Sequence, residues 1–279
     1  MKLSIFYTNK CNINCNHCFL GLQKEYYQMS SCMLKDILTQ CKCAGFNRVA
    51  FTGGEPLIYW KDIEKVLTEV NLQDVNISFS TNAYWAKDLK TSDQICKQLK
   101  ARGVTQIEAS CDEYHIKYIP LRNLINLACS AEKAGIKCKI VMCVSNKINY
   151  ISLYAKLRKY VLKENIILQN VGTFGNAKEN NIKSDLKKEV FMSAKCAQVM
   201  NPCITYTGDV YACCGPCILA GKNNVMYISN FMKEDLASIV NNMKNNEIIN
   251  KVSQCGPYFL RRDEKEYYSS LCEFCLHYS

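Results

Sequence analysis

The sequence Cys11-Asn-Ile-Asn-Cys15-Asn-His-Cys18 decides how the rest of the chain is interpreted. It is a C-x3-C-x2-C triplet that follows one short apolar segment. Three thiolates at this spacing can bind three irons of a [4Fe–4S] cluster and leave the fourth iron open to a small molecule. Such an iron indicates redox chemistry rather than a structural support. The spacing alone is weak evidence, because chance supplies about 0.09 such triplets in a chain this rich in cysteine.

Composition limits the classes of protein to consider. The chain has 279 residues, 48% of them hydrophobic and 19 of them cysteine, with a formal net charge of +10. This length suffices for one large α/β domain with a small appendage. We expect no membrane span and no signal peptide, because every apolar run is short. We therefore expect a cytoplasmic protein whose cysteines bind metal or are buried. The lysines are scattered, so nothing indicates nucleic-acid binding.

Segments with the patterns of strands and helices alternate up to about residue 175. Six such alternations predict a parallel sheet with crossover helices, either doubly wound or curved into a barrel. The expected strands are 3–8, 48–52, 75–80, 105–110, 137–144 and 165–171. The expected helices are 31–44, 61–70, 92–102, 121–134 and 152–162.

Two motifs follow expected strand ends, where parallel barrels collect their catalytic groups. They are the cysteine triplet and Gly53-Gly54-Glu55-Pro56. In this order they resemble the radical S-adenosylmethionine (SAM) superfamily, over about residues 1–175. The resemblance implies a partial (β/α)6 barrel of TIM-like type. It also implies a [4Fe–4S] cluster on Cys11, Cys15 and Cys18 that cleaves SAM to methionine and a 5′-deoxyadenosyl radical.

The resemblance implies further SAM-binding residues. Gly53 and Gly54 would let the backbone approach the SAM amino group, and Glu55 would offer its carboxylate to the ammonium. His17 is expected to support the loop or to be exposed rather than to bind iron. Asn176 stands where relatives often have arginine, so no role is expected for it. The weaker candidates at strand ends are Ser80, Asn82, Ser110 and Asp112.

The alternation stops after about residue 178, where a polar connection over 177–188 begins. We therefore expect a radical SAM core over 1–178 and a small C-terminal extension over 179–279. The extension is expected to contain a hairpin at 206–211 and one helix at 233–252. Its eight cysteines are Cys196, Cys203, Cys213, Cys214, Cys217, Cys255, Cys272 and Cys275.

The spacing of four of these cysteines resembles the auxiliary-cluster segments called SPASM and twitch. The resemblance implies one auxiliary [4Fe–4S] cluster, because the chain ends four residues after Cys275. Cys203 is a rival for the position of the first ligand. A structural zinc site is the alternative, since C-x2-C is equally typical of zinc. The four expected ligands are Cys196, Cys213, Cys272 and Cys275.

Adjacent cysteines rarely both bind one cluster, so one of Cys213 and Cys214 is expected to stay a free thiol. A weak S–H bond can donate a hydrogen atom to a radical. Cys-Cys after a Gly-Asp-Val-Tyr hairpin, with Ser-x-Asp-x-x-His at a strand end, resembles the radical SAM peptide epimerases. The resemblance gives Cys214 the role of hydrogen donor. Cys217 is a lesser candidate, and Cys214 could instead be a buried residue or a ligand.

The sequence thus predicts a radical SAM enzyme that modifies a ribosomally synthesised peptide, most simply by converting an L-residue to its D-form. Other enzymatic alternatives are thioether or C–C crosslinking and activation of a glycyl-radical protein. The non-enzymatic alternatives are a cluster-bearing electron carrier and a zinc-binding interaction module. The expected partners are a precursor peptide and a flavodoxin- or ferredoxin-type reductant, with no nucleic acid and no membrane. Because the chain begins at its first strand, no leader-peptide-binding domain is expected before it.

Overall fold

The computed structural model describes residues 1–145, 150–182, 195–260 and 270–277. Six strands pair in parallel with their neighbours in sequence, in the order β6-β5-β4-β3-β2-β1. This order confirms the partial (β/α)6 barrel and excludes the doubly wound alternative, because the order never reverses. The strands are β1 (Lys2–Thr8), β2 (Arg48–Gly53), β3 (Asn76–Thr81), β4 (Val104–Ser110), β5 (Lys137–Val144) and β6 (Ile166–Asn170).

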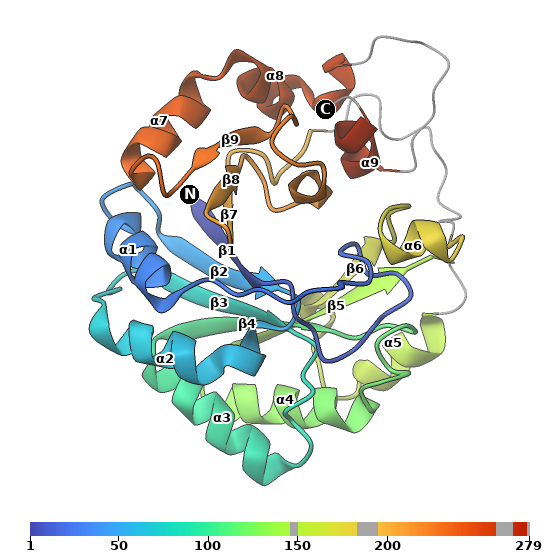
Figure 1. The fold of residues 1–279 in the computed structure, drawn as a ribbon. Coiled ribbons are helices and arrows are strands. Elements are labelled where there is room, and N and C mark those ends of the chain that lie inside the picture. The colour runs from blue at the N-terminus through green and yellow to red at the C-terminus, as the bar shows by residue number, and fades with distance from the viewer. Residues whose placement is uncertain (146–149, 183–194, 261–269, 278–279) are drawn as a thin grey trace.

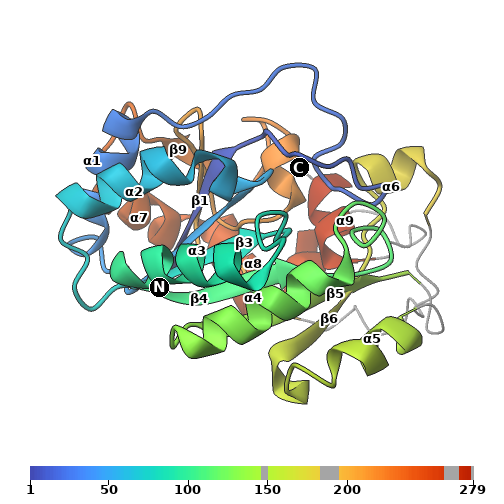
Figure 2. The ribbon, with the colours of Figure 1, turned by 90° about the horizontal axis from the view of Figure 1, so that it is seen from below.

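The helices that connect these strands cover one face of the sheet (Figure 1). Figure 2 shows α2, α3 and α4 following one another across this outer face. Polar side chains begin several helices; Asp88, for example, accepts a hydrogen bond from the Thr91 amide at the start of α3. The connecting helices are α1 (Ser31–Cys41), α2 (Trp60–Glu69), α3 (Leu89–Ala101), α4 (Leu121–Lys133) and α5 (Ile151–Leu157), and the short helix α6 (Asn176–Glu179) follows β6.

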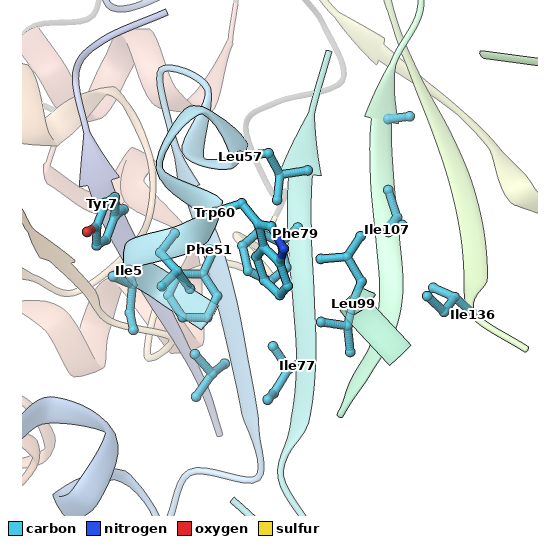
Figure 3. Packing of buried hydrophobic residues seen from close by; sticks show 14 of the residues in the cluster. Ile5, Tyr7, Phe51, Leu57, Trp60, Ile77, Phe79, Leu99, Ile107 and Ile136 are labelled. Atoms are coloured by element: carbon cyan, nitrogen blue, oxygen red, sulfur yellow. The ribbon is translucent and has the colours of Figure 1, made fainter. Parts of the chain in front are cut away.

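The hydrophobic core lies between the sheet and the outer helices (Figure 3). Its centre is the stacked pair Phe51 and Phe79, whose rings lie 4.6 Å apart, with Trp60 of α2 edge-on to Phe79. Strand β1 contributes Ile5 and other alternate residues to this core. Successive side chains of a strand point to opposite faces, so Ser4 lies on the inner face, away from the outer helices.

The C-terminal extension continues the same sheet beyond β1, in the order β1-β7-β8-β9. Strands β7 (Cys203–Thr205) and β8 (Asp209–Tyr211) are antiparallel and confirm the expected hairpin, and β9 (Tyr227–Asn230) follows. Pairing β7 with β1 covers a sheet edge that the first six strands leave open. The division into two units near residue 178 stays a prediction, and 183–188 of the expected polar connection lie outside the described residues.

The expectation of one helix over 233–252 is wrong. The structure has two helices there, α7 (Leu236–Asn245) and α8 (Glu247–Cys255). Asn246 between them has extended backbone angles, and its side chain accepts a hydrogen bond from the Ile249 amide. Asparagine at this position therefore starts a new helix instead of extending the old one. The last described helix is α9 (Leu271–His277), and Figure 1 shows α7, α8 and α9 across the sheet from α2, α3 and α4.

Candidate active site

The cysteine loop begins where β1 ends at Thr8. It turns back beside the end of β1, because the Thr8 hydroxyl donates to the Tyr27 carbonyl and the Asn9 side-chain oxygen accepts from the Tyr27 amide, at 2.6 and 2.7 Å. The loop closes on itself at the thiols, where the Cys18 amide donates to the Cys15 carbonyl at 3.0 Å. The three cysteines are therefore presented on one compact turn at the carboxyl ends of the strands.

The thiols of Cys11, Cys15 and Cys18 lie close enough to interact electrostatically. Burial raises the pKa of Cys15 well above the usual thiol value, and the neighbouring Asp112, Cys18 and Cys11 raise it further. Burial likewise raises the pKa of Cys11 to about 11. Thiols in this state keep their protons until a metal displaces them. A gathered, partly buried set of three sulfur donors is the donor set that a [4Fe–4S] cluster with one open iron requires.

Gly53 and Gly54 lie against the backbone that enters the cysteine loop. The Gly54 amide donates to the Thr8 carbonyl at 2.7 Å, and the Glu55 amide donates to the Lys10 carbonyl at 2.8 Å. A Cβ atom on Gly54 would overlap the Lys10 carbonyl, and one on Gly53 would overlap the Thr8 carbonyl. Gly53 also has a φ of +131°, which side chains disfavour. Two glycines are therefore required for β2 to hold the start of the loop.

The Glu55 side chain joins the ends of β2 and β3. One carboxylate oxygen accepts from the Asn82 amide at 2.7 Å and the Thr81 hydroxyl at 3.1 Å, and the other accepts from the Leu57 amide at 3.1 Å. The side chain is fully buried, and burial raises its pKa to about 7, against the lowering effect of these hydrogen bonds. The described hydrogen bonds of the Glu55 carboxylate are thus all to groups of the protein itself. Its contact with the SAM ammonium stays a prediction.

Asn82, a predicted SAM-binding residue, contacts the cysteine loop. Its side-chain nitrogen lies 2.8 Å from the Asn12 side-chain oxygen and 3.7 Å from the Cys11 sulfur. Ser80 and Ser110 alternate with buried core residues, so both are on the inner face of the sheet. The three residues therefore border the same region, and their contacts with SAM stay predictions.

Asp112 is the buried centre of a polar group at the end of β4. Its carboxylate accepts from the amides of Tyr114, His115 and Cys143, and it lies 2.8 Å from the His115 Nδ1 atom. The His17 Nε2 atom lies 3.8 Å away. Burial alone would raise the pKa of Asp112, but the hydrogen bond and charge of His115 outweigh it and lower the pKa. Asp112 thereby links β4, β5 and the cysteine loop.

His17 is mostly buried, and its ring stacks on Tyr114 with centroids 4.4 Å apart. Burial lowers its pKa to about 4, so the ring is neutral at physiological pH. This agrees with the expectation that His17 supports the loop.

Sequence reasoning missed the contribution of Gly175 and Asn176. The Asn176 side chain donates to the Cys15 carbonyl and to the Asn14 side-chain oxygen, both at 2.9 Å. Its amide donates to the Cys18 carbonyl at 2.9 Å. Gly175 has a φ of +57°, and a Cβ atom there would overlap the Phe19 carbonyl. A glycine followed by asparagine in the loop after the last barrel strand was the available signal.

Four cysteines of the C-terminal extension form a second group of thiols. Cys272 and Cys275 of α9 each interact electrostatically with Cys196 and Cys213. Burial is the largest cause that raises the pKa of Cys272, to about 12. Cys217 lies beside this group, with its sulfur 3.4 Å from the Cys213 sulfur. The expected set of ligands is thus together, with Cys217 as a further neighbour.

Cys214 has different side-chain hydrogen-bond partners from Cys213. Its sulfur accepts a hydrogen bond from the Cys203 thiol, which lowers the pKa of Cys214 and raises that of Cys203, and it also contacts the Ser4 hydroxyl. Cys203 pairs with Ser4 in the β1–β7 register, so both lie on the inner face of the sheet. Cys203 is fully buried there. The adjacent residues Cys213 and Cys214 therefore have different neighbours.

No helix in the described ranges is both long enough and apolar enough to cross a membrane.

Comparison with known proteins places this geometry in a family. The chain is 22% identical over 235 residues to YydG of Bacillus subtilis, whose name assigns it to peptide biosynthesis, and the match covers 79% of this chain and 71% of that protein. The structure of Streptococcus suis SuiB bound to the precursor peptide SuiA has the same fold, with a TM-score of 0.65, 17% identity and coverage of 98% of this chain and 75% of SuiB.

The structure of anSMEcpe with AdoMet and the Cp18Cys peptide has a TM-score of 0.61 and 13% identity, and the match covers 100% of this chain and 94% of anSMEcpe. Residues 5–152 match the model of the radical SAM superfamily. That segment holds the cysteine triplet, Gly53, Gly54, Glu55 and Asp112. The chain therefore belongs to the radical SAM superfamily, whose chemistry uses SAM at a [4Fe–4S] cluster.

Proposed function

We propose that this protein abstracts the Cα hydrogen of a residue in a ribosomally synthesised peptide and returns a hydrogen to the opposite face, so that an L-residue becomes a D-residue. Two similarities support a peptide substrate. YydG is named for peptide biosynthesis, and SuiB, whose fold is similar to that of this chain, binds a precursor peptide. The observation that favours epimerisation is the separation of Cys214 from Cys213, which leaves one thiol on the inner face of the barrel.

Different residues of this chain would have different roles in the proposed reaction. Cys11, Cys15 and Cys18 would hold the cluster, while Gly54 and Glu55 hold the loop in place. SAM, when bound, would supply the radical chemistry that removes the Cα hydrogen. The Cys214 S–H bond then breaks as a new C–H bond forms at Cα, which leaves a sulfur radical. One electron and one proton restore the thiol, the electron coming from a low-potential reductant.

A cavity of about 290 Å³ on the inner side could hold part of the peptide. It lies between the cysteine loop and the C-terminal extension, and its walls include Phe6, Leu20, Tyr206 and Asp209. Tyr206 stacks on Tyr27 of the loop, with ring centroids 6.0 Å apart. An apolar wall with a few polar groups is typical of a ligand-binding site.

Incubation with a precursor peptide encoded beside the gene, in D2O, tests epimerisation. We expect one deuterium at a Cα position and a D-residue in the hydrolysed product, because the Cys214 thiol exchanges with solvent. In ordinary water the mass of the peptide should not change. Crosslinking would instead remove two hydrogens from the peptide. A product without deuterium and without a D-residue would exclude epimerisation.

We also propose one auxiliary [4Fe–4S] cluster on Cys196, Cys213, Cys272 and Cys275. The mutual proximity of these four thiols supports this ligand set. The contact of Cys203 with Cys214 supports the exclusion of Cys203 from it. The closeness of Cys217 to Cys213 keeps Cys217 as the main rival ligand.

Metal analysis tests this ligand set. In a variant with alanine at Cys11, Cys15 and Cys18, we expect about four irons per chain to remain. Adding Cys196→Ala should remove most of this iron, since it deletes a ligand. Adding Cys203→Ala is the matched control and should leave the iron in place. One zinc per chain, or iron loss from the Cys203 variant alone, contradicts the proposal.

A further inference from the structure

A second cavity borders the other side of the cysteine loop, among the loops that follow β3 and β4. It is open, has a volume of about 430 Å³, and is lined by the Asn12–Ile13 segment of the cysteine loop. Tyr84 and Lys87 line it from the loop after β3, while Tyr118 and Arg122 line it from the loop after β4 and the start of α4. We call this surface, Tyr84, Lys87, Tyr118 and Arg122, the outer cationic face.

The outer cationic face carries positive charge that no ion pair among the described residues neutralises. Lys87 and Arg122 are both exposed, and neither forms an ion pair within the described residues. Lys117, next to Tyr118, is also exposed. Asp88, beside Lys87, keeps its negative charge, because hydrogen bonds from Thr91 lower the pKa of its carboxyl, but the exposed cations of this region outnumber it. The face should therefore attract an acidic partner.

The same face combines this charge with exposed apolar surface. Tyr118 is 45% exposed, and Ile116, close to it in sequence, is 39% exposed. The Tyr118 hydroxyl nevertheless donates to the Asn14 carbonyl of the cysteine loop at 2.7 Å. Large side chains of this kind, surrounded by polar groups, are typical of small transient protein interfaces.

A short path leads from this face to the sulfur of Cys11. Asn12 lines the cavity, and its side-chain oxygen accepts from the Asn82 side-chain nitrogen at 2.8 Å. That nitrogen lies 3.7 Å from the Cys11 sulfur. A carrier bound at this face would reach a cluster ligand through one hydrogen-bonded pair. It would also stay clear of the inner face, where Cys214 lies.

We propose that the outer cationic face is the docking site of an acidic one-electron carrier protein that reduces the cluster. Reductive cleavage of SAM consumes one electron from outside the chain, so a radical SAM enzyme needs such a partner. Opposite charges accelerate encounters of this kind more than they strengthen the complex. The inference rests on membership of the superfamily and is independent of epimerisation.

The test compares two reductants with the same holoenzyme. The rate of 5′-deoxyadenosine formation is measured with reduced flavodoxin, an acidic carrier, and separately with dithionite, which needs no docking. For Lys87→Glu/Arg122→Glu we expect the flavodoxin-driven rate to fall about tenfold or more, because steering is lost. The dithionite-driven rate should stay within about twofold of the unmodified enzyme, since both residues are exposed and neither forms an ion pair among the described residues.

Lys65→Glu/Lys97→Glu is the matched control, because it reverses two exposed charges on α2 and α3, and both of its rates should stay unchanged. Raising the salt from about 0.05 to about 0.3 M should slow the flavodoxin-driven reaction of the unmodified enzyme. An unchanged flavodoxin-driven rate in the Lys87/Arg122 variant overturns the proposal. An equal loss with both reductants also overturns it, since these residues would then serve the SAM site.

Discussion

Replacing Gly54 with alanine is expected to abolish SAM cleavage while the barrel still folds. A Cβ atom at this position would overlap the Lys10 carbonyl, which is backbone and cannot rotate away. The start of the cysteine loop would have to move from β2, and the hydrogen bond from Glu55 to Lys10 would break. A displacement of about 1 Å at a reacting site can cost about hundredfold in rate. We therefore expect at least that loss in 5′-deoxyadenosine formation.

Iron content and circular dichroism separate this effect from unfolding. Gly54→Ala should lose the iron bound by the cysteine triplet and keep its helical signal. Gly103→Ala is the control, because its φ of +80° also suits glycine but a Cβ atom there meets only a side-chain atom of Ile77, at 3.7 Å. That variant should lose about 1 kcal/mol of stability and keep its iron. A Gly54→Ala enzyme with normal iron and normal SAM cleavage would refute the role given to the glycines.

Replacing Cys214 with alanine is expected to end D-residue formation without stopping SAM cleavage. The cysteine triplet, Gly54 and Glu55 are untouched, so 5′-deoxyadenosine should still appear. The Cα radical would lack its hydrogen donor, so the D-product should fall by at least about hundredfold, which corresponds to about 2.7 kcal/mol in the barrier. Chiral analysis of the hydrolysed peptide, together with quantification of 5′-deoxyadenosine, measures both effects.

Cys203→Ala is the matched control for Cys214→Ala, because it removes the neighbouring thiol and leaves the proposed donor. It should still form the D-residue and incorporate deuterium. A Cys214→Ala enzyme that keeps doing so would remove the role proposed for that residue. If Cys217→Ala alone stopped D-residue formation, the donor would be the thiol beside Cys213 instead.

The fold was predictable because its signals are local. Each barrel strand is a short apolar run, and the cysteine triplet and Gly53-Gly54-Glu55 each occupy consecutive residues at a strand end. The sequence pattern did not separate helices α7 and α8, because the apolar periodicity continues through Asn246. Only the backbone shows that Asn246 begins a second helix there.

The connections between distant residues were not predictable from spacing. Asn176 reaches the cysteine loop because the sheet curves β6 back toward it, and no periodicity carries that information. The position of Cys203 beside Ser4 likewise depends on the β1–β7 register, which sequence spacing does not give, and the choice between Cys196 and Cys203 as a ligand stays a prediction. The backbone partners of Asp112 depend on how β5 follows β4, so spacing did not give them, and its contact with SAM stays a prediction.

The hydrogen bonds of Asn176 also limit when the cluster site can form during synthesis. Asn176 is 161 residues from the Cys15 carbonyl that it binds, so the loop carrying the triplet leaves the ribosome long before its last support does. Domains fold as units, and contacts distant in sequence form late. The cysteine triplet is therefore exposed as an incomplete site on the nascent chain. Iron delivered before residue 176 is in place meets a loop that lacks this support, so we expect the cluster to be loaded more completely after translation than during it.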